Sequence, residues 1–406
     1  MILPKSAALD ISQYGKYNGM QISSFLTRKE RLWLNHERTM GQVFLQQDFD
    51  RASERIIDSY NGADVSAAKK KAGTDLWHYC TSRHCRDMIL SFYLLGENDW
   101  PEDKIMNCLY ALSNHGERHY KRIPIAKRDG TVRTLLAPDP LLKYVQKNIL
   151  HHVLEGLSVS GCAMAYRKQP SSGIVCNAAK HVKKPLILKL DIKDFFGSIP
   201  FKMVLSRAFP VQYFPLEVGV LLTSLCCYGE YLPQGAPTSP MISNLVMKPF
   251  DEFMADWCSG QNISYSRYCD DMTFSGDFDV RKVRRRAEGF LHSMGFELNP
   301  DKTRVLPQSS RQTVTGLVVN DRVQVTALYR RNLRQEVHYC RRFGVKEHLL
   351  RSGKAERFLF PDGTVDCRRY LQVLLGKVQY VRLTRPEDAW FLKAEEWLKE
   401  AGYRYS

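Results

Sequence analysis

Three aspartates are the residues of this sequence whose types and spacing best fit a chemical site. Asp270 and Asp271 are adjacent in SRYCDDMTFSG, and Asp191 ends the apolar run PLILKLD. Three carboxylates that meet at one point repel each other unless a cation lies between them. Carboxylate oxygens are ligands that Mg²⁺ prefers, and two such ions can bridge a nucleoside triphosphate and an attacking hydroxyl. The aspartates therefore predict a site for two magnesium ions, although an Asp-Asp pair taken alone is more often a solvated turn.

Two strand patterns would position these aspartates. PLILKLDIKDFF is a continuous run of residues that favour strands, and ISYSRYCDDMTFSG alternates on both sides of the Asp pair. Such alternation is expected of a hairpin that carries the acids at its tip. A second hairpin is predicted in RIPIAKRDGTVRTLLAP, because an Asp-Gly pair joins two strand-like runs there. The patterns are helical before about residue 115 and after about residue 326, so the expected fold class is α+β.

The charge of the chain favours a polyanionic partner. The 406 residues include 59 Lys and Arg against 43 Asp and Glu, which gives a net charge of +16. This surplus is typical of proteins that bind nucleic acid, although other basic proteins share it. It would serve to hold a phosphate backbone and a triphosphate.

Other features indicate a reduced, non-membrane compartment. The 11 cysteines form no regular framework, which favours a cytoplasmic location. His78, Cys80, His84 and Cys85 have spacings that fit no common zinc module, so we interpret them as ordinary residues of a helix face. No apolar run approaches the ~18 residues of a spanning helix, and we expect no membrane partner.

Five ordered motifs resemble those of reverse transcriptases. In chain order they are RIPIAKRDGTVRTLLAP of the fingers, LDIKDFFGSIP of the first palm motif, LPQGAPTSPMISNLV of the Q-G-x-x-x-S-P motif, YCDD of the Y-x-D-D box, and GFELNPDKT of the motif that follows the box. They lie at the family's spacing over about residues 116–326. Two further strings, NAAKH at 177–181 and VTG at 314–316, are similar to strings of retron reverse transcriptases.

Position by position, the resemblance implies a set of site residues. Asp191, Asp270 and Asp271 would be catalytic and hold the two Mg²⁺ ions, with the backbone carbonyl of Ile192 as a further ligand. The residues that would contact the deoxynucleoside triphosphate are Lys127, Arg133, Phe196, Gln234, Gly235 and Lys302. Those that would contact RNA or primer are Asn177, His181, Tyr268, Thr315, Gly316, Arg330, Arg331, Arg334 and Arg341.

Several of these residues also have a structural interpretation. The Phe196 ring would exclude a ribose 2′-OH, or it would fill the core as its neighbour Phe195 does. Lys302 would protonate the departing pyrophosphate, or it is a surface charge at a helix start. Asn177 and His181 are four residues apart and share a helical face, where a buried or surface histidine is the commoner case. The VTG string is equally consistent with a structural turn, and the arginines with a solvated helix face.

The fold that the resemblance implies is a right-hand polymerase. We expect a helical N-terminal extension over 1–115, fingers over 116–185 with part of 200–240, an RRM-like antiparallel palm over 186–325, and a basic α-helical thumb over 326–406. The chain after the VTG string is too short for an added RNase H domain. Removal of the copied RNA is therefore assigned to a host RNase H.

The resemblance also implies a biological role. A retron reverse transcriptase copies a cognate structured non-coding RNA into single-stranded DNA, starts from an RNA 2′-OH, and leaves a branched RNA–DNA product called msDNA. Such systems serve in anti-phage defence with a separately encoded effector protein. Two alternatives stay open from the residues: another bacterial reverse transcriptase of the group II intron, abortive-infection or diversity-generating type, or a non-catalytic RNA-binding scaffold on the same fold.

Overall fold

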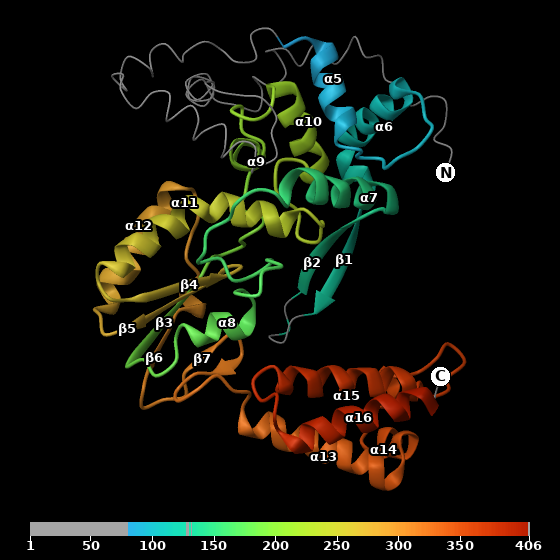
Figure 1. Cartoon of the computed structure of the whole chain (residues 1–406), viewed down its shortest axis with the longest axis vertical. Helices are drawn as coiled ribbons and strands as arrows, with labels where there is room; N and C mark the ends of the chain where they lie inside the picture. Colours follow the sequence, from blue (N-terminus) through green and yellow to red (C-terminus); the bar gives the residue numbers. More distant parts are fainter. Residues whose placement is uncertain (1–79, 127–129, 131, 405–406) are drawn as a thin grey trace. The chain divides into compact units, whose positions relative to one another are not determined.

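The computed structural model describes residues 80–126, 130 and 132–404 (Figure 1). Residue contacts divide the chain into two compact units. The first contains the described residues up to Tyr166, together with Ile192–Phe253 and Arg286–Asn299. The second contains Arg167–Asp191, Met254–Arg285 and the described residues from Pro300 onward. The predicted N-terminal helices before residue 80 and the predicted contact of Lys127 lie outside the described residues, and the four predicted domain boundaries stay predictions.

Helices form most of the first unit. One of them begins at a clear side-chain cap, because Asp139 accepts a hydrogen bond from the backbone of Leu142 at 2.8 Å and Pro140 takes the first helical position. The described helices that lie wholly in this unit are α5 (Ser82–Ser91), α6 (Glu102–Asn114), α7 (Pro140–Ile149), α9 (Phe201–Ala208) and α10 (Leu216–Cys226). Helix α10 is apolar on nearly every side and is buried along most of its length, so it forms the centre of this helical group.

His84 and Cys85 of the cysteine and histidine cluster lie in α5, Cys80 lies just before the Thr81 N-cap, and His78 lies outside the described residues. His84 forms a capping box with Thr81, as its Nδ1 accepts from the Thr81 backbone at 3.2 Å. The sulfurs of Cys80 and Cys85 lie 3.6 Å apart, both as free thiols. His84 and Cys85 therefore lie on the helix that the sequence predicts for this cluster.

The predicted fingers hairpin is present in the first unit. Strand β1 (Tyr120–Ala126) pairs antiparallel with β2 (Val132–Pro138), from Tyr120 opposite Pro138 to Ala126 opposite Val132. The base of the hairpin is fixed by polar contacts, because Gln146 of α7 donates to the Tyr120 hydroxyl at 2.7 Å. The far end of both strands is exposed to solvent. The hairpin is half-buried where it meets the helices and exposed at its far end, so it projects from its helical base.

The second unit contains a four-stranded antiparallel sheet. Its strands run in the order β4 (Ser264–Tyr268), β5 (Asp271–Gly276), β3 (Leu186–Asp191) and β6 (Arg304–Pro307). Alternation divides its residues between two faces. One face carries buried apolar side chains, among them Leu188, Leu190, Met272 and Phe274. The antiparallel palm sheet predicted from the sequence is confirmed.

A helical C-terminal region belongs to the same unit. It comprises α13 (Ala327–Phe343), α14 (Val345–Arg351), α15 (Cys367–Arg382) and α16 (Ala389–Arg404). Their apolar faces share one core with the short helix α8 (Ile174–Ala179) and the two-stranded ribbon of β7 (Thr313–Val314) and β8 (Leu317–Val318). The orange and red helices α13 to α16 of Figure 1 are the predicted helical region after residue 326. No helix among the described residues is both long and apolar enough to cross a bilayer.

The helices α11 (Ser239–Ser259) and α12 (Val280–Ser293) each begin in one unit and end in the other. Helix α11 follows the Q-G-x-x-x-S-P motif, and α12 follows β5. Both belong to the segments that connect the motifs of the first unit with the strands of the second.

Candidate active site

The Asp pair occupies a tight hairpin turn. Tyr268 of β4 faces Asp271 of β5 in the last pair of the ladder, so Cys269 and Asp270 form a two-residue turn. Cys269 has φ +61°, a conformation that usually requires glycine at the first position of such a turn. Arg267, whose side chain is fully buried, donates from Nη1 to the Cys269 carbonyl at 2.9 Å. This hydrogen bond stabilises an unusual turn that carries Asp270 at its tip.

Asp191 joins this turn through the sheet. It pairs with Asp271 at the end of the ladder between β3 and β5, and side chains of directly paired residues lie on the same face. Burial raises the pKa of Asp191, the hydrogen bond from Lys302 opposes this, and the charges of Asp270 and Asp271 add to it. Burial also raises the pKa of Asp271; Lys189 opposes this effect and Asp270 adds to it. The three predicted carboxylates are thus brought together, where they repel one another.

Lys302 supplies the positive charge at this cluster. It ends a single turn of 3-10 helix (Pro300–Lys302), and its Nζ lies 2.9 Å from Oδ1 and 3.0 Å from Oδ2 of Asp191. Burial opposes its charge, but the hydrogen bond to Asp191 and the three carboxylates outweigh this and raise the pKa of Lys302. The Lys302 side chain stays 58% exposed, so this residue is a surface lysine that also pairs with a buried carboxylate.

The carboxylates would have to close on a divalent cation, because no group of three or more His, Cys, Asp or Glu side chains among the described residues is already arranged to hold one. Asp191 is only 3% exposed, and both of its carboxylate oxygens lie within 3.0 Å of Lys302 Nζ. One ammonium does not balance three carboxylates that repel one another, so a divalent cation at this place would stabilise them. Asp191, Asp270 and Asp271 are the side chains that would hold the ion. Ile192, the other predicted ligand, follows Asp191 in the chain, is buried, and makes an isolated bridge to Leu298.

Phe195 and Phe196 have different environments. Phe195 is 4% exposed and contacts the Phe296 ring at 6.0 Å between centroids, so it fills the core as expected. Phe196 is half-buried, and the centroid of its ring lies 5.4 Å from that of Phe195. One side of the Phe196 ring is therefore supported by the core while the residue keeps contact with solvent.

The Q-G motif is docked on the fingers hairpin. The backbone N–H of Leu136 in β2 donates to the Gln234 carbonyl at 2.9 Å. Gly235 has φ +132°, and a Cβ placed on it would lie 2.6 Å from the Leu136 carbonyl oxygen. The absence of a side chain at Gly235 therefore permits a close approach between its loop and the β2 backbone. Arg133, also on β2, is exposed and faces Ile125 across the hairpin.

Asn177 and His181 lie in the interior, which differs from the expected contact with RNA. They are 1% and 0% exposed, and both belong to a hydrogen-bonded chain with Ser266 of β4 and Ser275 of β5. Both ring nitrogens of His181 and the side-chain oxygen of Asn177 thus have hydrogen-bond partners within the protein. Tyr268, by contrast, is half-buried at the end of β4 next to the aspartates.

Thr315 and Gly316 form the tight turn between β7 and β8. Both have positive φ, +48° and +82°, as a two-residue hairpin turn of type I′ requires. Threonine is uncommon in this conformation because of its β-branch. The Thr315 hydroxyl donates to the Ile174 carbonyl of α8 at 3.2 Å. The structural turn considered from the sequence is present, and the predicted primer contact stays a prediction.

Most of the predicted thumb arginines have partners inside the helical region. Arg330 donates to the Val325 carbonyl at 2.6 Å, and Arg334 lies 3.3 Å from Asp388. Arg341 donates to the Lys393 carbonyl at 2.7 Å. Arg331 is exposed. Arg334 and Arg341 therefore connect α13 to α16 and to the residue just before it. Sequence reasoning missed these contacts because the partners are remote in sequence.

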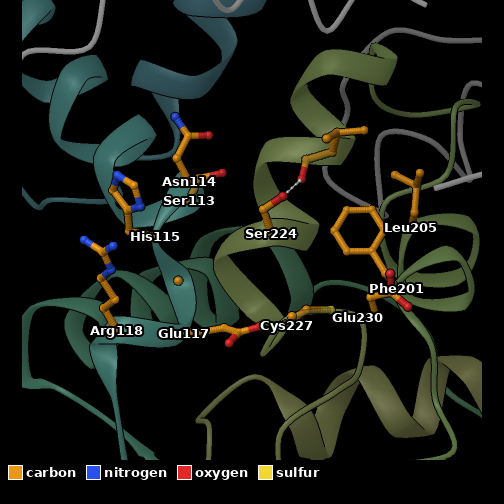
Figure 2. A pocket seen from close by; sticks show the side chains of 13 residues that line it. Ser113, Asn114, His115, Glu117, Arg118, Phe201, Leu205, Ser224, Cys227 and Glu230 are labelled. Carbon is orange, nitrogen blue, oxygen red and sulfur yellow. Dashed lines mark hydrogen bonds between the residues drawn. The ribbon is translucent and has the colours of Figure 1, made fainter. Parts of the chain in front are cut away.

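A separate cavity of about 560 Å³ lies in the first unit. Figure 2 shows His115 and Arg118 on one wall and the apolar side chains of Phe201 and Leu205 on the opposite wall. None of the predicted site residues lines it. The cavity is therefore distinct from the aspartate cluster of the second unit.

Comparison with known proteins finds similarity over the region that holds most of these motif residues. Residues 125–319 match the family described as reverse transcriptase (RNA-dependent DNA polymerase). The chain is 36% identical to the retron Mx65 reverse transcriptase of Myxococcus xanthus, over 67% of this chain and 63% of that protein. It is 32% identical to the retron Ec86 reverse transcriptase of Escherichia coli, over 54% of this chain and 69% of that protein. A third relative, the retron Mx162 reverse transcriptase of Myxococcus xanthus, is 34% identical over 50% of this chain and 47% of its own length.

Proposed function

Since the chain belongs to the retron-type reverse transcriptases, we propose that it is an RNA-directed DNA polymerase that copies a cognate non-coding RNA into single-stranded DNA. The pairing of Asp191 with Asp271 beside the turn that carries Asp270 gives this proposal its main support. An intact carboxylate set at the end of a palm sheet favours a catalyst over a scaffold that only binds RNA.

The metal requirement follows from the family and from these carboxylates. Asp191, Asp270 and Asp271 would hold two Mg²⁺ ions, which when bound supply charge stabilisation for the triphosphate and activate the attacking hydroxyl. Lys302 keeps its proton at neutral pH because its pKa is raised, and it neutralises part of the negative charge around Asp191. In this arrangement Lys302 is a charge partner of Asp191, and its predicted role as proton donor to the departing pyrophosphate stays a prediction.

Residues of the first unit would select the nucleotide. Phe196 would exclude the 2′-OH of a ribonucleotide, since its ring is braced by Phe195 and cannot retreat into the occupied core. Arg133 would contact the triphosphate as a bidentate donor, together with Lys127. Gln234 and Gly235 would set the position of the hairpin that carries Arg133, because both are docked on the β2 backbone.

The helical region of the second unit would hold the RNA and the primer. Burial lowers the pKa of Arg330, and the like charges of Arg385, Arg334 and Arg322 nearby lower it further. A cluster of guanidinium groups is stabilised when a phosphate lies beside it. Exposed Arg331 and the VTG turn would extend this contact along an A-form duplex.

The remaining parts of the role rest on the relatives' class. We place the enzyme in the cytoplasm, where a host RNase H would remove the copied template and a separately encoded effector would complete an anti-phage system. Its product would be a branched RNA–DNA molecule, msDNA, started from an RNA 2′-OH.

Isolation of the protein with its own nucleic acid tests this proposal. The full chain is expressed from its native locus, purified, and the bound nucleic acid is digested separately with DNase and RNase. A DNase-sensitive strand covalently joined to RNA is the expected result, and it should disappear in an Asp270→Ala/Asp271→Ala double variant. Bound RNA without any DNA in the wild type would favour the scaffold alternative. DNA that persists in the double variant would assign its synthesis to another enzyme.

A further inference from the structure

The NAAKH string forms a buried chain of hydrogen bonds under the palm sheet. His181 Nδ1 lies 2.7 Å from the Ser275 hydroxyl, and His181 Nε2 lies 2.7 Å from the Ser266 hydroxyl. Ser266 in turn donates to the Asn177 side-chain oxygen at 2.6 Å. All four residues are at most 1% exposed. The chain therefore joins Asn177 of α8, and His181 two residues beyond the end of α8, to two strands, and its members are shielded from solvent.

The hydrogen bonds fix the direction of each proton. Because Ser266 uses its only proton toward Asn177, its oxygen must accept from His181, so Nε2 carries the imidazole proton. Nδ1 is then the acceptor for the Ser275 hydroxyl. Burial and the nearby charges of Lys180 and Lys184 lower the pKa of His181 to about 3, so the ring is neutral at physiological pH. A single tautomer satisfies every member of the chain.

The two serines belong to the strands that carry the catalytic turn. Ser266 is two residues before Tyr268 in β4, and Ser275 is four residues after Asp271 in β5. Side chains at even spacing along a strand share one face, so both serines lie on the face that bears Asp271. The register agrees, because Tyr268 pairs with Asp271 and Ser264 pairs with Ser275. His181 thus connects both arms of the aspartate hairpin from the side of the carboxylates.

The VTG string connects to the same helix from the other side. The Thr315 hydroxyl donates to the Ile174 carbonyl at the start of α8. Val314 and Leu317, which flank the turn, pack with Ala178 of α8 in the core shared with the thumb helices. Helix α8 has only six residues and no side-chain cap. Its position consequently depends on these tertiary contacts.

We propose that Asn177 and His181 are positioning residues that hold the two arms of the catalytic hairpin, and that the VTG turn anchors the helix from which they act. The two strings similar to those of retron enzymes then form one brace, from Thr315 through α8 to Ser266 and Ser275. This inference rests on the proposed polymerase function in one respect, because only a polymerase would lose DNA synthesis when the brace is removed. The brace itself concerns the position of the three carboxylates. It assigns the strings to support of the metal site and not to side-chain contact with RNA.

Substitution of His181 separates these two roles. His181→Leu leaves both serine hydroxyls without their partner, whereas His181→Gln keeps a side-chain amide that can still donate to one serine and accept from the other. The matched control is His348→Leu, because His348 is also buried in the second unit and lies 3.2 Å from a hydroxyl, that of Tyr370. Loss of residues that orient metal ligands typically weakens metal affinity or activity by about 10- to 100-fold.

The readouts are Mn²⁺ affinity by electron paramagnetic resonance, RNA affinity by filter binding, and kcat and KM on a primed RNA template unrelated to the cognate RNA. For His181→Leu we expect about tenfold weaker Mn²⁺ binding and a similar fall in kcat, with RNA affinity within about twofold of wild type. His181→Gln should recover part of the loss. The His348→Leu control should lower thermal stability without weakening Mn²⁺ binding.

Opposite results would overturn the inference. Loss of RNA affinity with unchanged Mn²⁺ binding would assign His181 to RNA recognition. Nitrogen-15 chemical shifts of the wild-type imidazole give a second criterion, since any tautomer other than Nε2–H contradicts the hydrogen-bonded chain. If the wild type makes no DNA, the proposed function fails, while Mn²⁺ binding, RNA affinity and the tautomer still decide the role of His181.

Discussion

Gly235 is the position where a single methyl group should test the docking of the Q-G motif on the fingers hairpin. A Cβ at this residue would lie 2.6 Å from the Leu136 carbonyl oxygen, and its φ is +132°. An ordinary contact needs at least 3.4 Å, so the loop and β2 would have to separate by about 0.8 Å in Gly235→Ala. The conformation itself costs about 1–3 kcal/mol for a residue with a side chain. We expect the free energy of unfolding to fall by about 2–4 kcal/mol in total.

The matched control is Gly289→Ala. Gly289 lies inside α12, has no positive φ, and an added Cβ there would have no neighbour within 4 Å. Alanine in a helix is favoured over glycine by about 0.5–1 kcal/mol, so this variant should be as stable as the wild type or more so.

Urea unfolding of the full chain, followed by circular dichroism, measures the stability change in both variants. The KM for a deoxynucleoside triphosphate measures the functional consequence, and it should rise in Gly235→Ala alone. An unfolding free energy for Gly235→Ala within about 0.5 kcal/mol of wild type, together with an unchanged KM, would refute the close approach of these two backbones.

Three further changes probe separate parts of the site. Phe196→Ala should increase incorporation of ribonucleotides relative to deoxynucleotides in a primer-extension assay, and unchanged discrimination would remove its role as a steric gate. Lys302→Met removes the cation that competes for Asp191, so the Mg²⁺ concentration for half-maximal synthesis should fall severalfold while kcat decreases; Lys193→Met, at an exposed pair, should change neither. Glu395→Gln should destabilise the fold at pH 7, because hydrogen bonds from Lys399 and Arg382 lower the pKa of Glu395 from 4.5 to about 2. A lowered carboxyl pKa contributes its full stabilisation above the unfolded value of 4.5 and loses it as pH falls to the folded value of about 2. The difference in urea midpoint between wild type and variant should therefore shrink over this range, and a constant difference would contradict the ion pair.

Local patterns were sufficient to predict the aspartate hairpin. The alternation on both sides of Asp270 and Asp271 specifies two paired strands, and two residues between them leave room only for a tight turn. The strand that ends at Asp191 was visible as a β-favouring run, and antiparallel pairing with β5 brings its last residue opposite Asp271. These features depend on neighbours in sequence, which is why they could be read without a structure.

The supports of the site depend on residues that are distant in sequence. His181 meets its two serines across 85 and 94 positions, and serine in a strand carries no signal of such a partner. Lys302 likewise reaches Asp191 across 111 positions. The resemblance of NAAKH to retron strings implied that Asn177 and His181 contact RNA. A resemblance of sequence carries no information about whether a side chain is buried. Only the tertiary arrangement distinguishes a polar residue that faces solvent from one that is satisfied in the core.

The central claim is that Asp191, Asp270 and Asp271 form one cation site that drives RNA-templated DNA synthesis. The most direct test is incorporation of labelled deoxynucleotides on a primed RNA template across a Mg²⁺ titration, with wild type, Asp270→Asn and the control Asp277→Asn, which alters an exposed aspartate just after the same strand. Loss of metal-based charge stabilisation is worth several kcal/mol, so Asp270→Asn should lose about a thousandfold or more in rate while Asp277→Asn stays within about twofold of wild type. Synthesis by the wild type without a divalent ion, or by Asp270→Asn within about tenfold of the wild-type rate, would contradict the claim.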